Sequence, residues 1–218
     1  MKLLYLAGLT LGLLFLGVSR SNADSCPSDE FNGSALDGAK WDVFKGNPTV
    51  NTGILMLAGI SGTRAEIQSR TVCQYGVLHT SITSSNWKSQ SVPIEDSSFG
   101  FEHFTGTNGK CHYAVHFVAN GNLGLLRAVP KTDGSCEGDP PPENQKYIPI
   151  TNWDSVRNGA RGRIDITLIW TPTEVTLSVS DGGRNIGLAS YTGEVIPTIP
   201  LKIRLNANCM KRTEGDTQ

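Results

Sequence analysis

The chain has 218 residues, with 19 Lys and Arg against 20 Asp and Glu and a formal net charge of −1 at pH 7. Proteins that bind nucleic acid usually present a basic patch, whereas the basic residues here are scattered along the chain. The composition therefore excludes a typical nucleic-acid binder. The length favours a single domain with one sizeable core.

The first residues have the features of a secretory signal peptide. Lys2 precedes an apolar run, Leu3–Val18, and the small residues Ser21-Asn22-Ala23 follow it. The run is shorter than the roughly 20 apolar residues that a membrane-spanning helix needs, and no second apolar segment follows. We therefore expect residues 1–23 to be a signal peptide, residues 24–218 to form one secreted domain, and no membrane partner.

Five cysteines follow the predicted signal peptide: Cys26, Cys73, Cys111, Cys136 and Cys209. Export to an oxidising compartment allows disulfides. We predict a Cys26–Cys209 pair, because chain ends often lie close together in a domain, and a Cys111–Cys136 pair that flanks a predicted hairpin. Buried unpaired thiols are the alternative, and the odd number leaves at least one cysteine without a partner in the chain. A zinc site is not expected, because no two cysteines have C-x-x-C spacing.

The apolar residues after the signal recur mostly at every second position, which is the period of a β-strand. The clearest stretch is RIDITLIW at 163–170, where Ile164, Ile166, Leu168 and Trp170 share one face. The predicted strands in chain order are 40–44, 53–58, 64–70, 75–83, 98–104, 112–118, 123–129, 163–170, 174–180, 184–190 and 201–207. This number of short strands predicts an all-β fold, a two-sheet antiparallel jelly-roll sandwich.

Turn-forming residues separate the predicted strands. Asn120-Gly121 and Asp181-Gly182-Gly183 supply the backbone freedom that tight hairpins need. The stretch KTDGSCEGDPPPEN at 131–144 contains three consecutive prolines, which cannot join a strand ladder, so it is predicted to be a surface loop.

Four stretches together resemble the concanavalin A-like lectin/glucanase superfamily, particularly glycoside hydrolase family 16. They are DEFNGSALDGAKWDV at 29–43, RAEIQSRTVCQYGVLHTSITS at 64–84, IDITLIWTPTEVTLSVSDG at 164–182 and IPLKIRLNAN at 199–208. The resemblance implies a jelly-roll fold and a polysaccharide or glycan ligand. It also implies that a structural calcium ion is possible, for which Asp29 is a candidate ligand, while no other cofactor is expected.

The chain departs from that hydrolase family at the catalytic strand, whose signature resembles E-x-D-x-E. In one register Phe99, Phe101 and His103 replace its acids, and in the other only Glu102 remains. Retaining hydrolysis needs two carboxyl groups about 5–5.5 Å apart, so a partner must come from another strand. Glu66, on the polar face of 64–68, is the best candidate. Glu66, Glu102 and His103 are therefore the candidate catalytic residues of a hydrolase.

A second enzymatic alternative comes from RAEIQ at 64–68. It resembles the R-T/S-E-L-R motif of jelly-roll polysaccharide lyases of the alginate-lyase type. In such a lyase Ala114-Val115-His116 would stand for the Q-I-H motif, without its glutamine. His112 and His116 share a strand face but lie about 13 Å apart on an ideal strand, so independent packed or solvated histidines are expected rather than a metal site.

The interpretation that we favour is a non-catalytic, lectin-like domain. Sugars are bound by aromatic rings and by planar polar side chains. Trp87 and Trp153, in polar settings, are candidate platforms at the rim of a concave sheet, whereas Trp41 and Trp170 are expected in the core. The candidate sugar-binding residues on that sheet are Arg64, Glu66, Gln68, Glu102 and His103. A protein-binding structural sandwich is a further alternative, and the sequence leaves the oligomeric state open.

Overall fold

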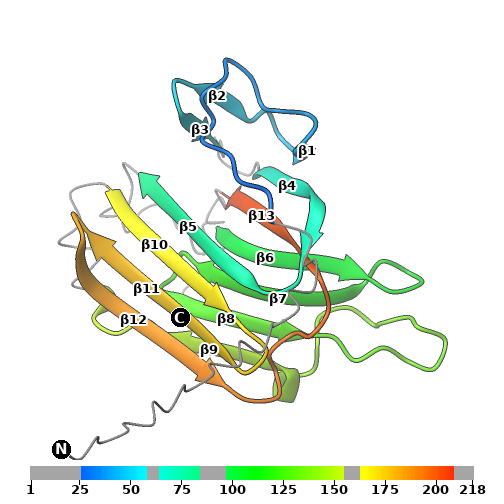
Figure 1. The fold of residues 1–218 in the computed structure, drawn as a ribbon. Coiled ribbons are helices and arrows are strands. Elements are labelled where there is room, and N and C mark those ends of the chain that lie inside the picture. The colour runs from blue at the N-terminus through cyan, green and yellow to red at the C-terminus, as the bar shows by residue number, and fades with distance from the viewer. Residues whose placement is uncertain (1–25, 58–63, 84–96, 155–162, 209–218) are drawn as a thin grey trace, which may run out of the picture.

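The computed structural model describes residues 26–57, 64–83, 97–154 and 163–208, and these form a sandwich of two antiparallel sheets (Figure 1). One sheet has seven strands in the order β1-β4-β13-β6-β7-β8-β9, and the other has four in the order β12-β11-β10-β5. A separate hairpin, β2–β3, lies at one end of the molecule (Figure 1). The predicted all-β, two-sheet antiparallel sandwich is confirmed.

The strands of the larger sheet, in spatial order, are β1 Trp41–Lys45, β4 Arg64–Cys73, β13 Leu201–Asn208, β6 Ser98–Thr105, β7 Cys111–Val118, β8 Asn122–Arg127 and β9 Gln145–Pro149. Those of the smaller sheet are β12 Arg184–Thr192, β11 Glu174–Asp181, β10 Arg163–Trp170 and β5 Gly76–Thr83. The hairpin consists of β2 Thr49–Asn51 and β3 Ile54–Met56, and a short 3-10 helix spans Pro142–Asn144.

The strand predictions hold with two exceptions. Residues 53–58 were expected to form one strand, but β3 is shorter and pairs with β2, a strand that the sequence pattern missed. β9 was also missed, because its five residues follow a proline-rich loop and end in Pro149, which lacks the amide hydrogen that a central strand needs. As an edge strand, β9 tolerates that proline.

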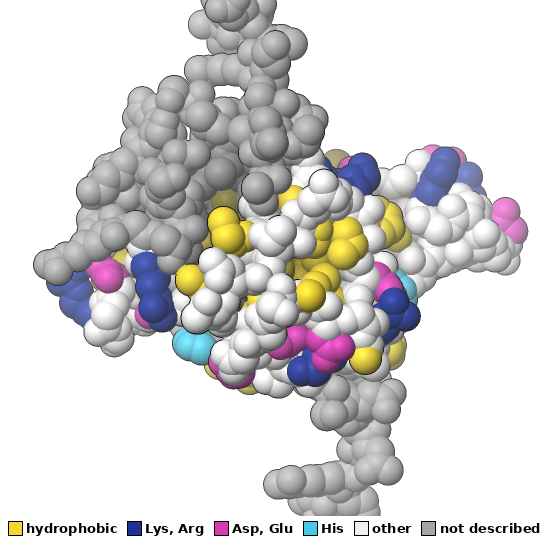
Figure 2. All heavy atoms as spheres, turned by 90° about the horizontal axis from the view of Figure 1, so that it is seen from above, with side chains coloured by type: hydrophobic (Ala, Val, Ile, Leu, Met, Phe, Trp, Pro, Cys, Tyr) yellow, Lys and Arg dark blue, Asp and Glu magenta, His cyan; other side chains and the backbone are white. Residues whose placement is uncertain are grey.

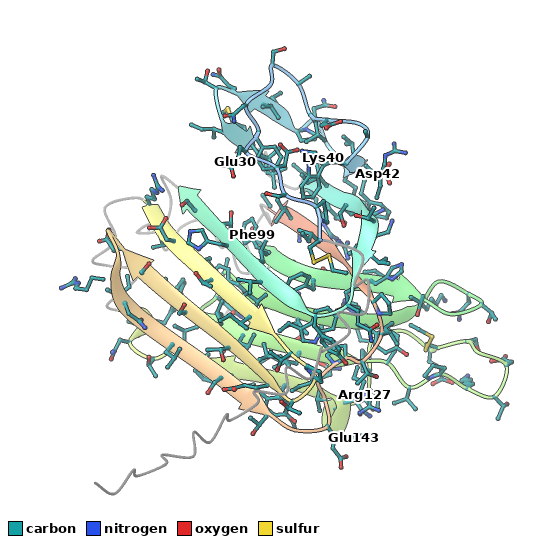
Figure 3. The ribbon with its side chains drawn as sticks, viewed as in Figure 1. Glu30, Lys40, Asp42, Phe99, Arg127 and Glu143 are labelled. Atoms are coloured by element: carbon teal, nitrogen blue, oxygen red, sulfur yellow. A yellow bond between two sulfur atoms is a disulfide. The ribbon has the colours of Figure 1, made fainter. Side chains whose placement is uncertain are left out.

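The core lies between the two sheets and is built by the period-two alternation of their strands. In β10 the residues Ile164, Ile166, Leu168 and Trp170 are buried, as predicted. Phe101 of β6 lies across from them, with its ring centroid 5.3 Å from that of Trp170. Figure 3 labels Phe99, which packs against the same core from two residues earlier in β6. Odd-numbered residues of β6 therefore face the smaller sheet.

One of the two predicted disulfides is confirmed and one is wrong. Cys111 pairs with Cys136, which closes the loop between β7 and the segment before β9. Cys26 pairs with Cys73 rather than with Cys209, which lies outside the described residues. The N-terminal segment lies beside β1 and β4, where the Trp41 indole N–H donates a 2.7 Å hydrogen bond to Asp29, so Cys26 approaches the end of β4. Two disulfides are consistent with an extracellular protein.

The predicted signal peptide, residues 1–23, lies outside the described residues and stays a prediction. Within the described ranges, no helix has the length and the apolar character needed to cross a membrane.

The strand order separates the two strands that carry the candidate acids. β13, from the C-terminal end of the chain, lies between β4 and β6 and pairs antiparallel with both (Figure 1). Glu66 on β4 and Glu102 on β6 are therefore separated by a strand that the sequence analysis had not placed between them. A residue of β13 can reach both acids.

We expect Phe101→Ala to lower the free energy of unfolding by about 3–5 kcal/mol, because it removes a fully buried ring and leaves a cavity against Trp170. Urea denaturation measures this change. The control is Ile169→Ala, which truncates an exposed apolar side chain of β10 and should change stability by no more than about 0.5 kcal/mol. Equal losses in the two variants would contradict the assignment of Phe101 to the core.

Candidate functional site

The face of the seven-stranded sheet turned away from the smaller sheet, here the outer face, carries the polar residues of the larger sheet. Alternation along β6 places Phe101 in the core and Glu102 on the outer face. Antiparallel pairing aligns Gly100, His116, Gly124 and Tyr147 in one row across β6, β7, β8 and β9. The same row continues to Arg204 of β13, opposite Gly100.

Arg204 lies between the two candidate acids and binds both. Its Nε donates a short hydrogen bond to Glu66 Oε1, and its Nη1 lies 2.7 Å from Glu102 Oε1. Arg64 contacts the other Glu66 oxygen, Oε2, at 2.7 Å. Glu66, Glu102 and Arg204 are 0%, 7% and 6% exposed, so these charges are shielded from water, and Arg64 supplies the second cation that balances the two acids. Arg64, Glu66, Glu102, His112 and Arg204 are called the Arg204 network below.

The two histidines of β7 converge on Glu102. His112 Nε2 lies 2.7 Å from Glu102 Oε1, and its Nδ1 lies 3.2 Å from Asp139 of the loop before β9. His116 Nδ1 lies 4.0 Å from Glu102 Oε2. Both histidines are packed side chains, and they share Glu102 as a neighbour because its side chain spans the space between them. Within the described ranges, no group of three or more His, Cys, Asp or Glu side chains has an arrangement that could hold a metal ion.

His116 occupies a space that two glycines leave open. A Cβ atom at Gly124 would lie 2.5 Å from His116 Nε2, and one at Gly100 would lie 2.5 Å from His116 Cα. Real Cβ atoms do not approach so closely, so only glycine fits on either side. Both ring nitrogens of His116 are buried and have no hydrogen-bond partner in the described part of the chain.

The environment of Glu102 keeps it ionised. Burial alone would raise the pKa of Glu102, but the hydrogen bond with His112 and the positive charges of nearby His116 and Arg204 outweigh burial. The pKa of Glu102 consequently lies well below its ordinary value of 4.5. Glu102 is thus a carboxylate at any physiological pH, able to accept hydrogen bonds but unable to donate a proton.

Three aromatic side chains lie on the outer face around the Arg204 network. The Phe104 ring stacks on His112 with centroids 4.1 Å apart, and the Arg204 guanidinium carbon lies 5.0 Å from the Phe104 centroid and 5.7 Å from that of Phe44. Tyr147 of β9 is close enough to Glu102 and Asp139 that burial and these negative charges raise its pKa. Phe44, Phe104 and Tyr147 are 57%, 44% and 51% exposed. Each ring therefore has solvent-exposed surface, and the buried charged side chains of the Arg204 network lie beneath the three rings.

The structure brings together most, though not all, of the residues predicted to line the sheet. Arg64, Glu66, Gln68 and Glu102 share the outer face, and Gln68 pairs with Arg204 across β4 and β13. His103 does not join them, because neighbouring residues of a strand point to opposite faces. Its Nδ1 lies 3.4 Å from the Pro200 carbonyl oxygen, and burial lowers its pKa.

Of the two predicted tryptophan platforms, the described one, Trp153, is not at the rim of this face. Trp153 packs edge-on against Phe117, at 5.6 Å, on the core-facing side of β7. Trp87 lies outside the described residues. Asp29, the candidate calcium ligand, accepts hydrogen bonds from the Phe31 N–H and the Trp41 indole, and a calcium ion there stays a prediction.

Sequence reasoning missed Arg204, the partner of both acids, and the aromatic residues Phe44, Phe104 and Tyr147. A signal for Arg204 was present, because 201–206 alternates apolar Leu201, Ile203 and Leu205 with polar residues. That pattern places Arg204 on a polar face but does not say which strands flank it.

The arrangement limits the chemistry of the acid pair. General acid catalysis of glycoside hydrolysis needs a protonated carboxyl group beside a second carboxylate. Glu102 is ionised, and Glu66 contacts the guanidinium groups of Arg64 and Arg204 without exposure to solvent. The network is therefore a layer of paired, buried charges beneath the aromatic side chains. Figure 2 likewise shows Lys and Arg beside Asp and Glu at several points of the described surface, without a field of one sign.

No protein-family model matches the chain, and no curated protein sequence matches it. Among solved structures it is similar to a laminarinase from Flavobacterium sp. UMI-01, with 16% identity over 82% of this chain and 85% of that chain and a TM-score of 0.49. It is also similar to a β-1,3-1,4-glucanase (lichenase) derived from a mouse hindgut metagenome, with 16% identity, 83% and 85% coverage and a TM-score of 0.48.

A third similar structure is a legume lectin-like domain from Entamoeba histolytica, with 9% identity, 78% and 82% coverage and a TM-score of 0.45. These three similar structures are thus two glucanases and a lectin-like domain. Identities and TM-scores this low do not indicate an activity or a ligand for this chain.

We expect Glu102→Gln to destabilise the protein by about 3–5 kcal/mol at pH 7, because it leaves Arg204 buried beside one carboxylate fewer. The folded-state pKa of Glu102 lies below 4.5, so its contribution to stability is fully present above pH 4.5 and is lost as the pH falls further. Urea denaturation at pH 7, 4 and 3 should therefore show the difference between the native protein and this variant shrinking in acid.

The matched control is Glu143→Gln, which neutralises an exposed acid of the 3-10 helix, labelled in Figure 3. Its stability should follow that of the native protein at all three pH values. A difference between the native protein and Glu102→Gln that stays constant from pH 7 to pH 3 would contradict the assigned pKa direction.

Proposed function

We propose that the protein binds a glycan on the outer face of its seven-stranded sheet without cleaving it, and that it does so outside the cell. The observation that carries this proposal is the group of three half-exposed aromatic rings, Phe44, Phe104 and Tyr147, above the buried Arg204 network. The two disulfides support the extracellular setting.

Exposed rings of this kind suit the apolar C–H faces of pyranose rings. Phe104 is oriented by its stacking on His112 and its approach to Arg204, and Phe44 by its approach to the same guanidinium. Rings that are already fixed lose little conformational entropy when a ligand binds. The rings are spread over the width of the sheet, because β1 and β9 are its two edge strands and β6 is its middle strand. Such a spread suits an extended chain better than a single sugar.

The charge state of the acids supports binding over hydrolysis. A retaining or inverting glycosidase needs one carboxyl group that holds a proton at working pH. The pKa of Glu102 is lowered, and Glu66 is shared between two arginines. Glu102 therefore holds no proton that it could donate.

A second candidate function, polysaccharide lyase action, is favoured by one observation. His116 is buried, and neither of its ring nitrogens has a hydrogen-bond partner in the described ranges, although such nitrogens are normally paired. In its neutral form, the His116 imidazole would remove the proton next to a uronate carboxyl group, and the C–H electrons would form a carbon–carbon double bond as the glycosidic oxygen leaves and takes a proton from water. Tyr147 lies in the same cross-strand row, one strand beyond Gly124.

We expect Phe104→Ala and Tyr147→Ala each to weaken glycan binding about tenfold, the equivalent of 1.4 kcal/mol for a lost stacking contact. Affinity electrophoresis on gels containing laminarin, barley β-glucan, agarose, carrageenan or alginate identifies a binding polysaccharide, and calorimetry measures the affinity. The control is Val77→Ala, an exposed apolar residue of β5 in the other sheet. Binding that neither aromatic substitution weakens would contradict the assigned face.

The same incubations separate the enzymatic alternatives from binding. A protein that only binds should release neither reducing ends nor unsaturated sugars, which are detected by their ultraviolet absorbance. Reducing ends that form without unsaturated products and disappear in Glu102→Gln would establish a hydrolase. Unsaturated products that disappear in His116→Ala would establish a lyase.

A further inference from the structure

We infer that a second ligand site, for one uncharged sugar ring, lies beside the turn between β7 and β8. A depression of about 430 Å³ lies between this turn and the segment that follows β9. Asn120, Asn122, Asn152, Trp153 and Asp154 line it. The volume falls within the range of small-molecule sites in proteins.

The two walls of the depression are tied together by backbone hydrogen bonds. The Ile150 N–H donates to the Gly121 carbonyl oxygen at 2.9 Å, and the Gly121 N–H donates to that of Val118 at 2.9 Å. The Thr151 N–H donates to Leu188 of β12, also at 2.9 Å. The segment after β9 is thereby fixed both to the hairpin turn and to the smaller sheet, so the depression is formed before any ligand arrives.

Trp153 is held so that its indole forms part of this depression. One side packs on Gly121, where an added Cβ atom would lie 2.2 Å from the ring, and on Phe117. Gly121 also has a φ of 95°, a conformation that favours glycine. The partial burial of Trp153 therefore orients the ring, and its remaining surface faces the depression.

The polar lining suits hydroxyl groups. Each asparagine amide offers both donors and acceptors in one plane, and Asp154 adds a carboxylate. The Asn122 amide donates to Asn120 Oδ1 at 2.7 Å, which links two of the lining side chains. Asn152 has a φ of 57°, a strained conformation of the kind that gathers at binding sites.

The lining also selects against charged ligands. No Lys or Arg among the described residues lines the depression, so phosphate or sulfate groups would find no counter-ion there. Aromatic surface, amides and one carboxylate together suit a neutral polyol, and a single hexose suits the volume better than a chain does.

This site is distinct from the Arg204 network, although Asn122, two residues before Gly124 in β8, is on the outer face. Trp153 contacts the core-facing side of β7 through Phe117, whereas His112 and His116 lie on the opposite side of the same strand. The inference therefore stands whether or not a polysaccharide binds above the Arg204 network. If both sites bind, one chain would contact a polysaccharide and a single sugar at separate places.

Saturation-transfer NMR with the methyl glycosides of glucose, galactose, mannose and N-acetylglucosamine tests the inference. At least one glycoside should receive saturation from the native protein, and Asn122→Ala or Asn152→Gly should weaken its binding at least tenfold. Asn152→Gly removes the amide but keeps a residue that tolerates the positive φ, so it should fold even if a Trp153 variant does not. Asn47→Ala, an exposed asparagine between β1 and β2, is the control and should bind as the native protein does.

Phe104→Ala separates this inference from the proposed function. Retained glycoside binding in Phe104→Ala, together with its loss in Asn152→Gly, supports the second site. Binding lost in Phe104→Ala but retained in Asn122→Ala and Asn152→Gly overturns it and leaves the outer-face proposal intact. Absence of saturation transfer to all four glycosides also overturns it. Affinity electrophoresis on the polysaccharide gels then tests the outer face independently.

Discussion

The contacts of Arg204 with Glu66 and Glu102 set the character of the outer face. A charge buried without a partner costs several kcal/mol, and here one guanidinium on β13 is shared by carboxylates on the strands to either side. Arg64 supplies a second cation to Glu66, and His112 a second contact to Glu102. The order β4-β13-β6 and this charge balance depend on each other, because any other strand between β4 and β6 would leave the two acids without Arg204.

The same contacts connect stability to function. Residues that hold Glu102 as a carboxylate also orient the rings above it, since Phe104 stacks on His112 and lies over Arg204. A network that is buried and paired can support the aromatic surface proposed for binding, and it keeps Glu102 ionised. The proposed binding on this face and the ionised state of Glu102 thus rest on one arrangement of charges.

Local patterns succeeded where the relevant contact is close in sequence. The Cys111–Cys136 pair flanks a single hairpin and was predicted, whereas Cys26 was assigned to Cys209 from a general tendency of chain ends and in fact pairs with Cys73. Grouping His103 with Glu102 failed for a simpler reason, because adjacent strand residues face opposite ways. Trp153 was recognised as a polar-loop tryptophan, but its packing against Phe117 could not be read from its neighbours in sequence.

The sequence by itself determined the β class, most strand positions and which residues of each strand share a face, because side-chain direction alternates with period two whatever the partner strand. It thereby placed Glu66 and Glu102 each on a polar face. Only the tertiary structure decided that these faces join and that Arg204 lies between the acids. Strand order depends on contacts between segments more than 100 residues apart, and Glu66 and Arg204 are separated by 138 residues. Such long-range pairing is set by packing of the whole core, which leaves no local trace in the chain.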